Sequence, residues 1–126
     1  MIGLQISMYV QLFILPIITL IVGIIANNNP PKEINGFRGY RTALSKSSQE
    51  AWDYANMRSS QIMIKGSIIS LIVGAVVLAV YLIAKLSPLN AVFAVVIVTV
   101  MMVQLLIIII PNISIEKELR DEVYKK

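Results

Sequence analysis

Three long apolar stretches, residues 4–26, 62–86 and 89–110, determine what this chain can fold into. Each is long enough to cross a hydrocarbon core about 30 Å thick as a helix that rises about 1.5 Å per residue. Because no water inside a bilayer can pair with exposed backbone groups, each stretch is expected to be an α-helix despite its many β-branched residues. The sequence therefore predicts an all-α membrane protein with three transmembrane helices and one domain, residues 1–126.

Composition narrows the function classes. The chain is 57% hydrophobic, whereas soluble domains are about 45–50% apolar. It has no cysteine and no histidine, which excludes thiol catalysis, the usual zinc sites and the commonest general base. We therefore expect no enzyme activity and no cofactor or metal. The first charged residue is Lys32, so the basic region of a signal peptide is missing and the first stretch is expected to remain in the protein.

Basic residues predict the orientation in the membrane. Of the eleven basic residues, six lie between the first two stretches or at their border and four lie in residues 112–126. The positive-inside rule places residues 27–61 and the tail, 112–126, in the cytoplasm, with the N-terminus outside. The same rule accounts for the net charge of +4 without a nucleic-acid partner. The expected location is the plasma membrane, as a multi-pass protein.

Polar and small residues inside the stretches predict how the helices pack. Pro16 should bend the first helix, because proline removes one backbone hydrogen bond. Gly66, Ser70 and Gly74 recur every four residues and allow another helix to approach closely, within the chain or between two copies. The polar residues of the third stretch, Thr99 and Gln104, should face the bundle interior.

The helix ends are marked by turn and capping residues. The run at 27–31, which ends in two prolines, should end the first helix. Ser47 with Glu50 forms a capping box, so a helix should begin near Ser48 and either continue into the second stretch or bend near 59–60. We favour continuity. Residues 85–90 predict a tight turn, with Pro88 in the first turn of the third helix.

After Pro111 we expect a separate short helix that lies on the bilayer or against the polar segment. Its predicted salt-bridge pairs are Glu116/Arg120, Asp121/Lys125 and Glu122/Lys126, and its apolar stripe is Ile115, Leu119 and Val123.

Residues 35–56 form the long polar segment in which we expect any specific recognition. Arg38 and Arg41 alternate with Phe37 and Tyr40, next to Gly39. These arginines could bind a lipid phosphate or a peptide carboxylate. Alternatively, they could only fix the orientation of the chain in the membrane and extend toward lipid headgroups.

A helix that carries Trp52 and Asn56 follows in the same segment. Trp52 is expected to anchor at the membrane interface and to pack against the glycine loop. The nearby acids Glu50 and Asp53 could pair with the arginines, and are weak candidates for catalysis because neither metal nor histidine accompanies them.

One spaced set of residues in the segment forms a pattern: Asn35, Gly39, Tyr40, Arg41, Thr42, Trp52 and Asn56. An asparagine, a glycine four residues later, then an aromatic residue, arginine and threonine, with a tryptophan about ten residues on, resemble the SdpI family of bacterial membrane proteins. The resemblance covers roughly residues 30–86. Asn56 stands where many members carry a histidine, so a proton or metal role at that position cannot apply here. Arg38 lies outside the pattern.

The resemblance implies immunity of a producing cell against a secreted, membrane-active peptide toxin. In the best-known member, which is about twice as long, it also implies signalling by holding a transcriptional repressor at the membrane. The candidate binding residues for a toxin, a lipid headgroup or a cytoplasmic regulator are Asn35, Arg38, Gly39, Tyr40, Arg41, Thr42, Trp52 and Asn56. The alternative function is a small lipid-binding or accessory subunit that forms homo-oligomers through Gly66, Ser70 and Gly74.

Overall fold

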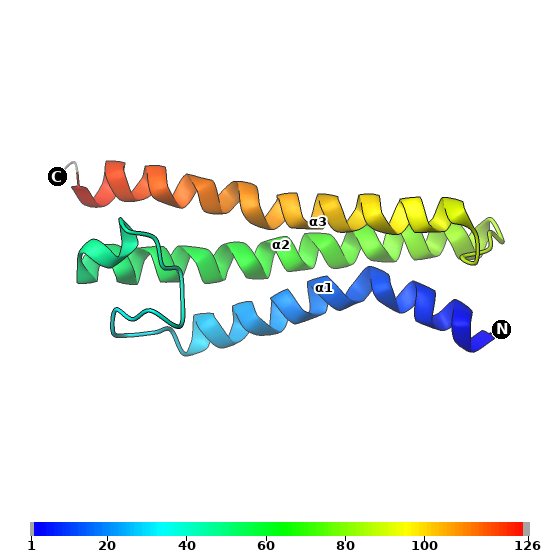
Figure 1. The fold of residues 1–126 in the computed structure, drawn as a ribbon, viewed down its shortest axis with the longest axis horizontal. Helices are drawn as coiled ribbons and strands as arrows, with labels where there is room; N and C mark the ends of the chain where they lie inside the picture. The colour runs from blue at the N-terminus through cyan, green and yellow to red at the C-terminus, as the bar shows by residue number, and fades with distance from the viewer. Residues whose placement is uncertain (1, 125–126) are drawn as a thin grey trace.

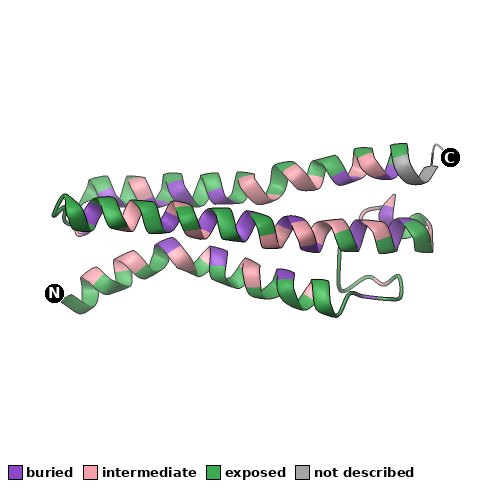
Figure 2. Ribbon diagram, turned by 180° about the vertical axis from the view of Figure 1, so that it is seen from behind, coloured by how far each residue is buried: buried purple, intermediate pink, exposed green. Residues whose placement is uncertain are grey.

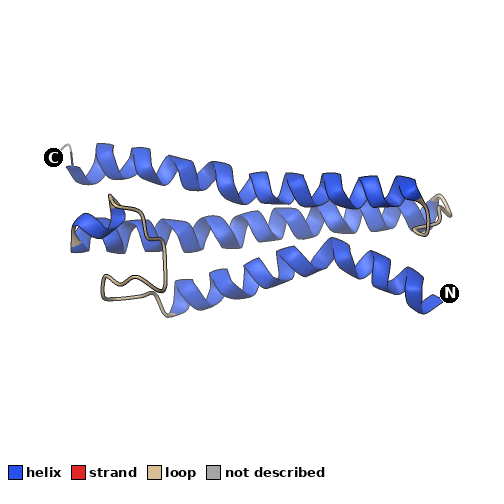
Figure 3. Cartoon of the chain, viewed as in Figure 1, coloured by secondary structure: helices blue, strands red, loops and turns tan. Residues whose placement is uncertain are grey.

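The computed structural model describes residues 2–124, with side chains described through residue 121. This part of the chain contains five helical elements, joined by loops. They are α1 (Ile2–Asn28), η1 (Ser45–Ser47), α2 (Gln49–Ile83), α3 (Ala91–Glu118) and η2 (Leu119–Tyr124). The three α-helices are long and apolar enough to cross a membrane. No strand occurs within residues 2–124, as Figure 3 shows, so the predicted all-α fold with three membrane-length helices is confirmed.

The three long helices run alongside one another, with α2 between α1 and α3 (Figure 1). The N-terminus lies at the end of the bundle where α2 turns into α3. The connection between α1 and α2 lies at the other end, together with the end of α3. Figure 2 shows that buried residues face the neighbouring helices while most of the outer surface is exposed. That exposed surface is rich in isoleucine, valine and leucine, which suits contact with lipid chains.

α1 contains Pro16 and bends along its length, as expected (Figure 1). Proline has no N–H, so the carbonyl of Leu12, four residues earlier, loses its helical partner. Nε2 of Gln104, fully buried in α3, donates to that carbonyl at 3.3 Å. The inward position predicted for Gln104 is therefore confirmed, and its partner is the carbonyl that Pro16 leaves unpaired.

The small-residue stripe Gly66, Ser70 and Gly74 is buried along α2. A β-carbon at Gly66 would lie 3.2 Å from Ile107 in α3. A β-carbon at Gly74 would lie 3.1 Å from the carbonyl oxygen of Leu12 in α1. The stripe thus brings α2 close to both of its neighbours within one chain, the first of the two packing roles expected for it.

Thr99 is exposed on α3, so the prediction that it faces the bundle interior is wrong. Its Oγ1 donates to the carbonyl of Val95 at 2.8 Å. A threonine hydroxyl can be satisfied by the carbonyl one turn earlier in its own helix, and so it needs no partner on another helix.

α2 begins at Gln49 and continues without interruption to Ile83, so the predicted continuity is confirmed. The capping residue is Ser48, whose Oγ accepts from the N–H of Ala51 at 3.1 Å. The capping box predicted for Ser47 is wrong by one residue, because Ser47 is still part of the short helix η1.

The turn between α2 and α3 comprises residues 84–90, one residue more than the predicted turn at 85–90, because the helices end and begin at Ile83 and Ala91. Lys85 has a φ of 55°, and the N–H of Leu86 donates to the Tyr81 carbonyl at 2.9 Å. This arrangement is a Schellman-type helix end.

Asn90 caps the start of α3, where its Oδ1 accepts from the N–H of Phe93 at 3.0 Å. Pro88 therefore precedes the helix instead of lying in its first turn. An asparagine side chain that pairs with an orphan N–H is the stronger start signal.

α3 does not end at residue 110 but passes through Pro111 and continues to Glu118, so the prediction of a separate short helix is wrong. The side chain of Asn112 donates to the carbonyl of Ile108 at 2.6 Å, close to the site of the missing proline N–H. The added turns bury Ile115 and Leu119, which supplies the packing that keeps the helix going past proline.

The tail therefore packs against the polar segment and α2, which is the second of the two positions expected for it. Ile115 and Leu119 lie in one buried cluster with Ala51 and Ala55 of α2. Two predicted pairs, Asp121/Lys125 and Glu122/Lys126, and the stripe residue Val123 involve side chains outside the described residues.

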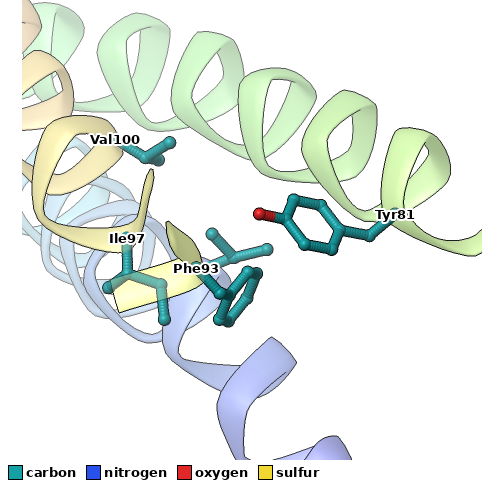
Figure 4. Packing of buried hydrophobic residues seen from close by; sticks show 5 residues of the cluster. Tyr81, Phe93, Ile97 and Val100 are labelled. Atoms are coloured by element: carbon teal, nitrogen blue, oxygen red, sulfur yellow. The ribbon is translucent and has the colours of Figure 1, made fainter. Parts of the chain in front are cut away.

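An aromatic cluster joins all three helices at the end of the bundle opposite the polar segment. The rings of Tyr81 and Phe93 meet edge to face with centroids 4.8 Å apart, and Tyr9 of α1 lies 5.6 Å from Phe93. Figure 4 shows Tyr81 and Phe93 beside Ile97 and Val100, which belong to the same buried cluster. Edge-to-face pairs add stability beyond the area that they bury.

Candidate functional site

The polar segment is folded locally by its own side chains, beginning with Asn35. The Oδ1 of Asn35 accepts hydrogen bonds from the N–H groups of Phe37 and Arg38 at 2.9 and 2.7 Å. Its Nδ2 donates to the carbonyl of Glu33 at 2.9 Å. Asparagine side chains of this kind stabilise turns, so Asn35 shapes the loop around Gly36 and its side-chain amide is already engaged.

Gly39 and Asn56 fit against each other where the loop meets α2. Gly39 has a φ of 101°, and a β-carbon there would overlap Asn56 Oδ1 and lie 2.9 Å from Pro31. The same Oδ1 accepts from the Tyr40 N–H at 2.8 Å, while Asn56 Nδ2 donates to the carbonyl of Trp52 at 2.9 Å. Asn56, which is buried, therefore attaches the loop to α2 through Oδ1, while Nδ2 fixes the amide to its own helix.

Trp52 is fully buried, so the prediction of an anchor at the lipid interface is wrong. Its Nε1 donates to the carbonyl of Pro31 at 2.7 Å. Through this bond Trp52 holds Pro31, which leads into the glycine loop, against α2. Packing of the ring against the glycine loop stays a prediction.

Thr42 closes the loop together with Ser45, a residue that the sequence pattern did not single out. The Thr42 N–H donates to Ser45 Oγ at 2.9 Å, and the Ser45 N–H donates to Thr42 Oγ1 at 3.1 Å. The Oγ of Ser45 also donates to the Tyr40 carbonyl at 3.0 Å. A serine three residues after a threonine just before a helical turn is a local signal for such a reciprocal cap.

Tyr40 connects the loop to the far end of α3. Its hydroxyl donates to Glu116 Oε1 at 2.9 Å, and burial together with this carboxylate raises the pKa of Tyr40 above its usual value. The predicted pair Glu116/Arg120 therefore does not describe the main contact of Glu116.

An ion pair adds a second connection between α2 and α3. Arg58 Nε lies 3.0 Å from Glu118 Oε2, which also accepts from the Tyr54 hydroxyl at 2.8 Å. The sequence pattern missed Glu118, because its partners Tyr54 and Arg58 are 64 and 60 residues away in the chain.

The sequence suggested that Arg38 and Arg41 could pair with Glu50 or Asp53, but the structure does not show these pairs. The guanidinium groups donate to backbone carbonyls, Arg38 to Asn29 and Arg41 to Gly36. Asp53 accepts a hydrogen bond from its own helix neighbour Gln49. Among the described residues, no three acidic side chains gather as a group that could hold a metal ion.

A cavity of about 610 Å³ lies between this loop, α1 and α2; we call it the loop cavity. Three cations line it: Arg38, Arg41 and Lys46. Its other walls include apolar residues of α1, such as Val22 and Ile25. No acidic side chain contributes to the lining, so the loop cavity combines positive charge with an apolar wall.

The eight candidate residues thus divide into two groups. Asn35, Gly39, Thr42, Trp52 and Asn56 form the hydrogen bonds and close contacts that brace the loop, and Tyr40 connects it to α3. Arg38 and Arg41 place charge in the loop cavity, whose lining also includes Gly39, Tyr40, Thr42 and Asn56. The positive charge at the loop cavity therefore comes from the two arginines and from Lys46, a third cation that the sequence pattern did not include.

Comparison with known proteins places this segment in a family. Over 50 residues the chain is 42% identical to the "Uncharacterized protein YfhL" of Bacillus subtilis (strain 168). That alignment covers 40% of this chain and 46% of the relative, so less than half of the relative's length is matched. No solved structure matches the chain. The model of the SdpI/YfhL protein family matches residues 32–114, which include the loop, α2 and most of α3. This multi-pass membrane protein therefore belongs to the SdpI/YfhL protein family, as its sequence pattern had indicated.

Proposed function

We propose that this protein protects a bacterial cell against a secreted, membrane-active peptide toxin, and that it does so by binding rather than by catalysis. The family match over residues 32–114 carries the proposal, because it includes all three cations of the loop cavity and the residues that brace the loop. The protein would reside in the cytoplasmic membrane with its N-terminus outside. The loop and the end of α3 lie at one end of the bundle, in agreement with a shared cytoplasmic side.

In this proposal the braced loop holds Arg38 and Arg41 in position for an anionic group. Guanidinium groups bind carboxylates and phosphates through paired donors, and each of these two has donors beyond the one that bonds a loop carbonyl. A peptide carboxylate, or the head of a lipid that the toxin requires, would meet these donors inside the loop cavity. A cytoplasmic regulator could reach the same end of the molecule.

The test is protection of a toxin-sensitive bacterial host that expresses the protein. The wild type should raise survival against at least one secreted peptide, and the double variant Arg38→Gln/Arg41→Gln should lose protection while inserting normally. The matched control is Lys117→Gln/Arg120→Gln, which removes the same charge near the same end but from a different cavity, and which should still protect. Unchanged killing by every candidate peptide in cells that express the wild type would refute the proposal.

A second candidate function, a small lipid-binding or accessory subunit, is favoured by the lining of the loop cavity. Three cations beside an apolar wall of α1 suit an anionic lipid whose headgroup meets the arginines and whose chain lies along Val22 and Ile25. Anionic lipid that copurifies with the wild type and is lost in Arg38→Gln/Arg41→Gln, without any protection in the host, would select this function over immunity.

A further inference from the structure

A second cavity, separate from the loop cavity, lies between α2 and α3 and has a volume of about 550 Å³. We call it the α2–α3 groove. Its α2 wall carries Arg58, Lys65 and Ile69, and its α3 wall carries Leu106 and Ile110. Apart from the two cations, the residues that line it are apolar side chains, one glycine and one proline. Neither the proposed immunity function nor the braced loop accounts for this groove.

Helices α2 and α3 are in contact at the bottom of the groove, but the side chains on its two walls are exposed. Gly66 lies so close to α3 that a β-carbon there would be 3.2 Å from Ile107. On the outer side, the side chains of Ile69 and Ile110 are 50% and 59% exposed. Lipid chains are as apolar as these side chains, so in a bilayer a chain can cover the walls without a protein partner.

Lys65 gives the groove a net positive charge. Arg58 is compensated by Glu118, whose Oε2 lies 3.0 Å from its Nε. Lys65 is exposed, and none of the acidic side chains described in the structure forms an ion pair with it. A lysine at this position can extend its ammonium group toward a headgroup while its stem stays against the apolar wall. The charge at the groove therefore favours an anionic headgroup.

The length of the groove suits one leaflet. Arg58 and Ile69 are eleven residues apart in one continuous helix, which corresponds to roughly 16 Å at about 1.5 Å per residue. Half of a hydrocarbon core about 30 Å thick is about 15 Å. Lys65 lies between these two residues, and its long side chain can extend its ammonium group toward the Arg58 end. One acyl chain whose headgroup lies at the Arg58 end would therefore extend along the groove within a single leaflet.

We propose that the α2–α3 groove binds one anionic phospholipid from the leaflet next to the polar segment. Its phosphate contacts the Lys65 ammonium group, and one acyl chain lies between Ile69 and Leu106. The lipid fills the α2–α3 groove on the outer side of these two helices.

The experiment measures lipid retained by the purified full-length protein from nanodiscs that contain equal phosphatidylglycerol and phosphatidylcholine, by native mass spectrometry. Lys65→Gln should retain roughly fivefold less phosphatidylglycerol, as expected for one lysine near an anionic surface. The matched control Lys85→Gln, at the other end of α2, should retain as much as the wild type. Leu106→Trp, which fills the groove, should lower retention of the bound lipid without removing charge. The buried Trp52 reports by its emission whether the charge variants remain folded.

Three results would overturn the proposal. Equal retention by Lys65→Gln and the wild type, with loss only in Arg38→Gln/Arg41→Gln, would assign the anionic lipid to the loop cavity. Equal retention of phosphatidylcholine and phosphatidylglycerol by the wild type would reduce the groove to an apolar surface. Efficient disulfide formation between two Leu106→Cys chains would show that a second copy covers it. Each result is independent of toxin protection, so immunity can fail or hold separately.

Discussion

Asn56 Oδ1 occupies the space that a β-carbon at Gly39 would require, and the same oxygen accepts the N–H of Tyr40 at 2.8 Å. The loop can approach α2 this closely only because residue 39 has no side chain and adopts a φ of 101°. Two residues that stand seventeen positions apart thus form one contact. They set the position of the neighbouring arginines relative to the loop cavity.

Gly39→Ala should destabilise this contact by about 1–3 kcal/mol, because alanine would be strained at a positive φ and its methyl group would collide with Asn56. The chain contains one tryptophan, Trp52, which is buried and whose carbonyl accepts from the Nδ2 of Asn56, the residue that Gly39 contacts. Quenching of its fluorescence by acrylamide should therefore increase in the variant. Gly36→Ala is the matched control, since nothing lies within 4 Å of a β-carbon there, and its quenching should equal that of the wild type. Similar quenching in both variants would mean that the contact does not hold the loop.

Trp52→Phe tests the hydrogen bond that holds the start of the loop. Phenylalanine keeps most of the buried ring but cannot donate to the Pro31 carbonyl, which Trp52 Nε1 reaches at 2.7 Å. An unsatisfied buried carbonyl costs about 1–3 kcal/mol, and the variant should lose that much stability in unfolding followed by circular dichroism. Phe37→Leu, at a position 93% exposed, should change stability by less than about 0.5 kcal/mol. No loss in Trp52→Phe would assign the role of Trp52 to ring packing alone.

The three helices and their order could be predicted from the sequence because hydrocarbon leaves the backbone few choices. The errors lie where a local signal competed with long-range packing. Pro111 is a strong helix breaker in isolation, yet α3 continues because Ile115 and Leu119 bury against Ala51 and Ala55. The sequence indicated the apolar stripe of Ile115 and Leu119, but not that its contact with α2 carries α3 through the proline.

The residues of the loop could be identified from the sequence, but which of them brace the loop and which place charge in the cavity could not. Spacing selected Asn35, Gly39 and Arg41 together, whereas the structure gives the first two a bracing role and leaves the third in the loop cavity. Lys46 was missed because it lies outside the spaced pattern. Glu118 was missed because its partner Arg58 is sixty residues away.

The contact between α2 and the end of α3 should depend on charge. Arg58 and Glu118 are each 29% exposed, so the pair is only partly shielded from solvent. A double-mutant cycle with Arg58→Gln and Glu118→Gln should give a coupling energy of about 0.5–1 kcal/mol in thermal unfolding. The coupling should decrease at high salt, because salt screens partly exposed charges. Lys117→Gln should show no coupling to Arg58→Gln, and a cycle that is insensitive to salt would contradict an electrostatic contact.

The hydrogen bond from Gln104 to the Leu12 carbonyl should replace the helical hydrogen bond that this carbonyl loses because residue 16 is proline. The two groups are 3.3 Å apart, and an alanine at position 16 would supply the N–H that proline lacks. Gln104→Leu should cost about 0.6–1.7 kcal/mol in the wild-type background, the range found for hydrogen bonds between membrane helices. In the Pro16→Ala background the same substitution should cost clearly less, since the carbonyl then has a partner in its own helix. Reversible unfolding in mixed micelles measures the stability of all four proteins of the cycle.

Thr99→Val serves as the control for loss of a polar group in α3. Because Thr99 is exposed and bonds within its own helix, the substitution should cost under about 0.5 kcal/mol. An equal cost for Gln104→Leu in both backgrounds would show that the glutamine is needed for another reason, such as its contact with the Ser70 carbonyl at 3.4 Å.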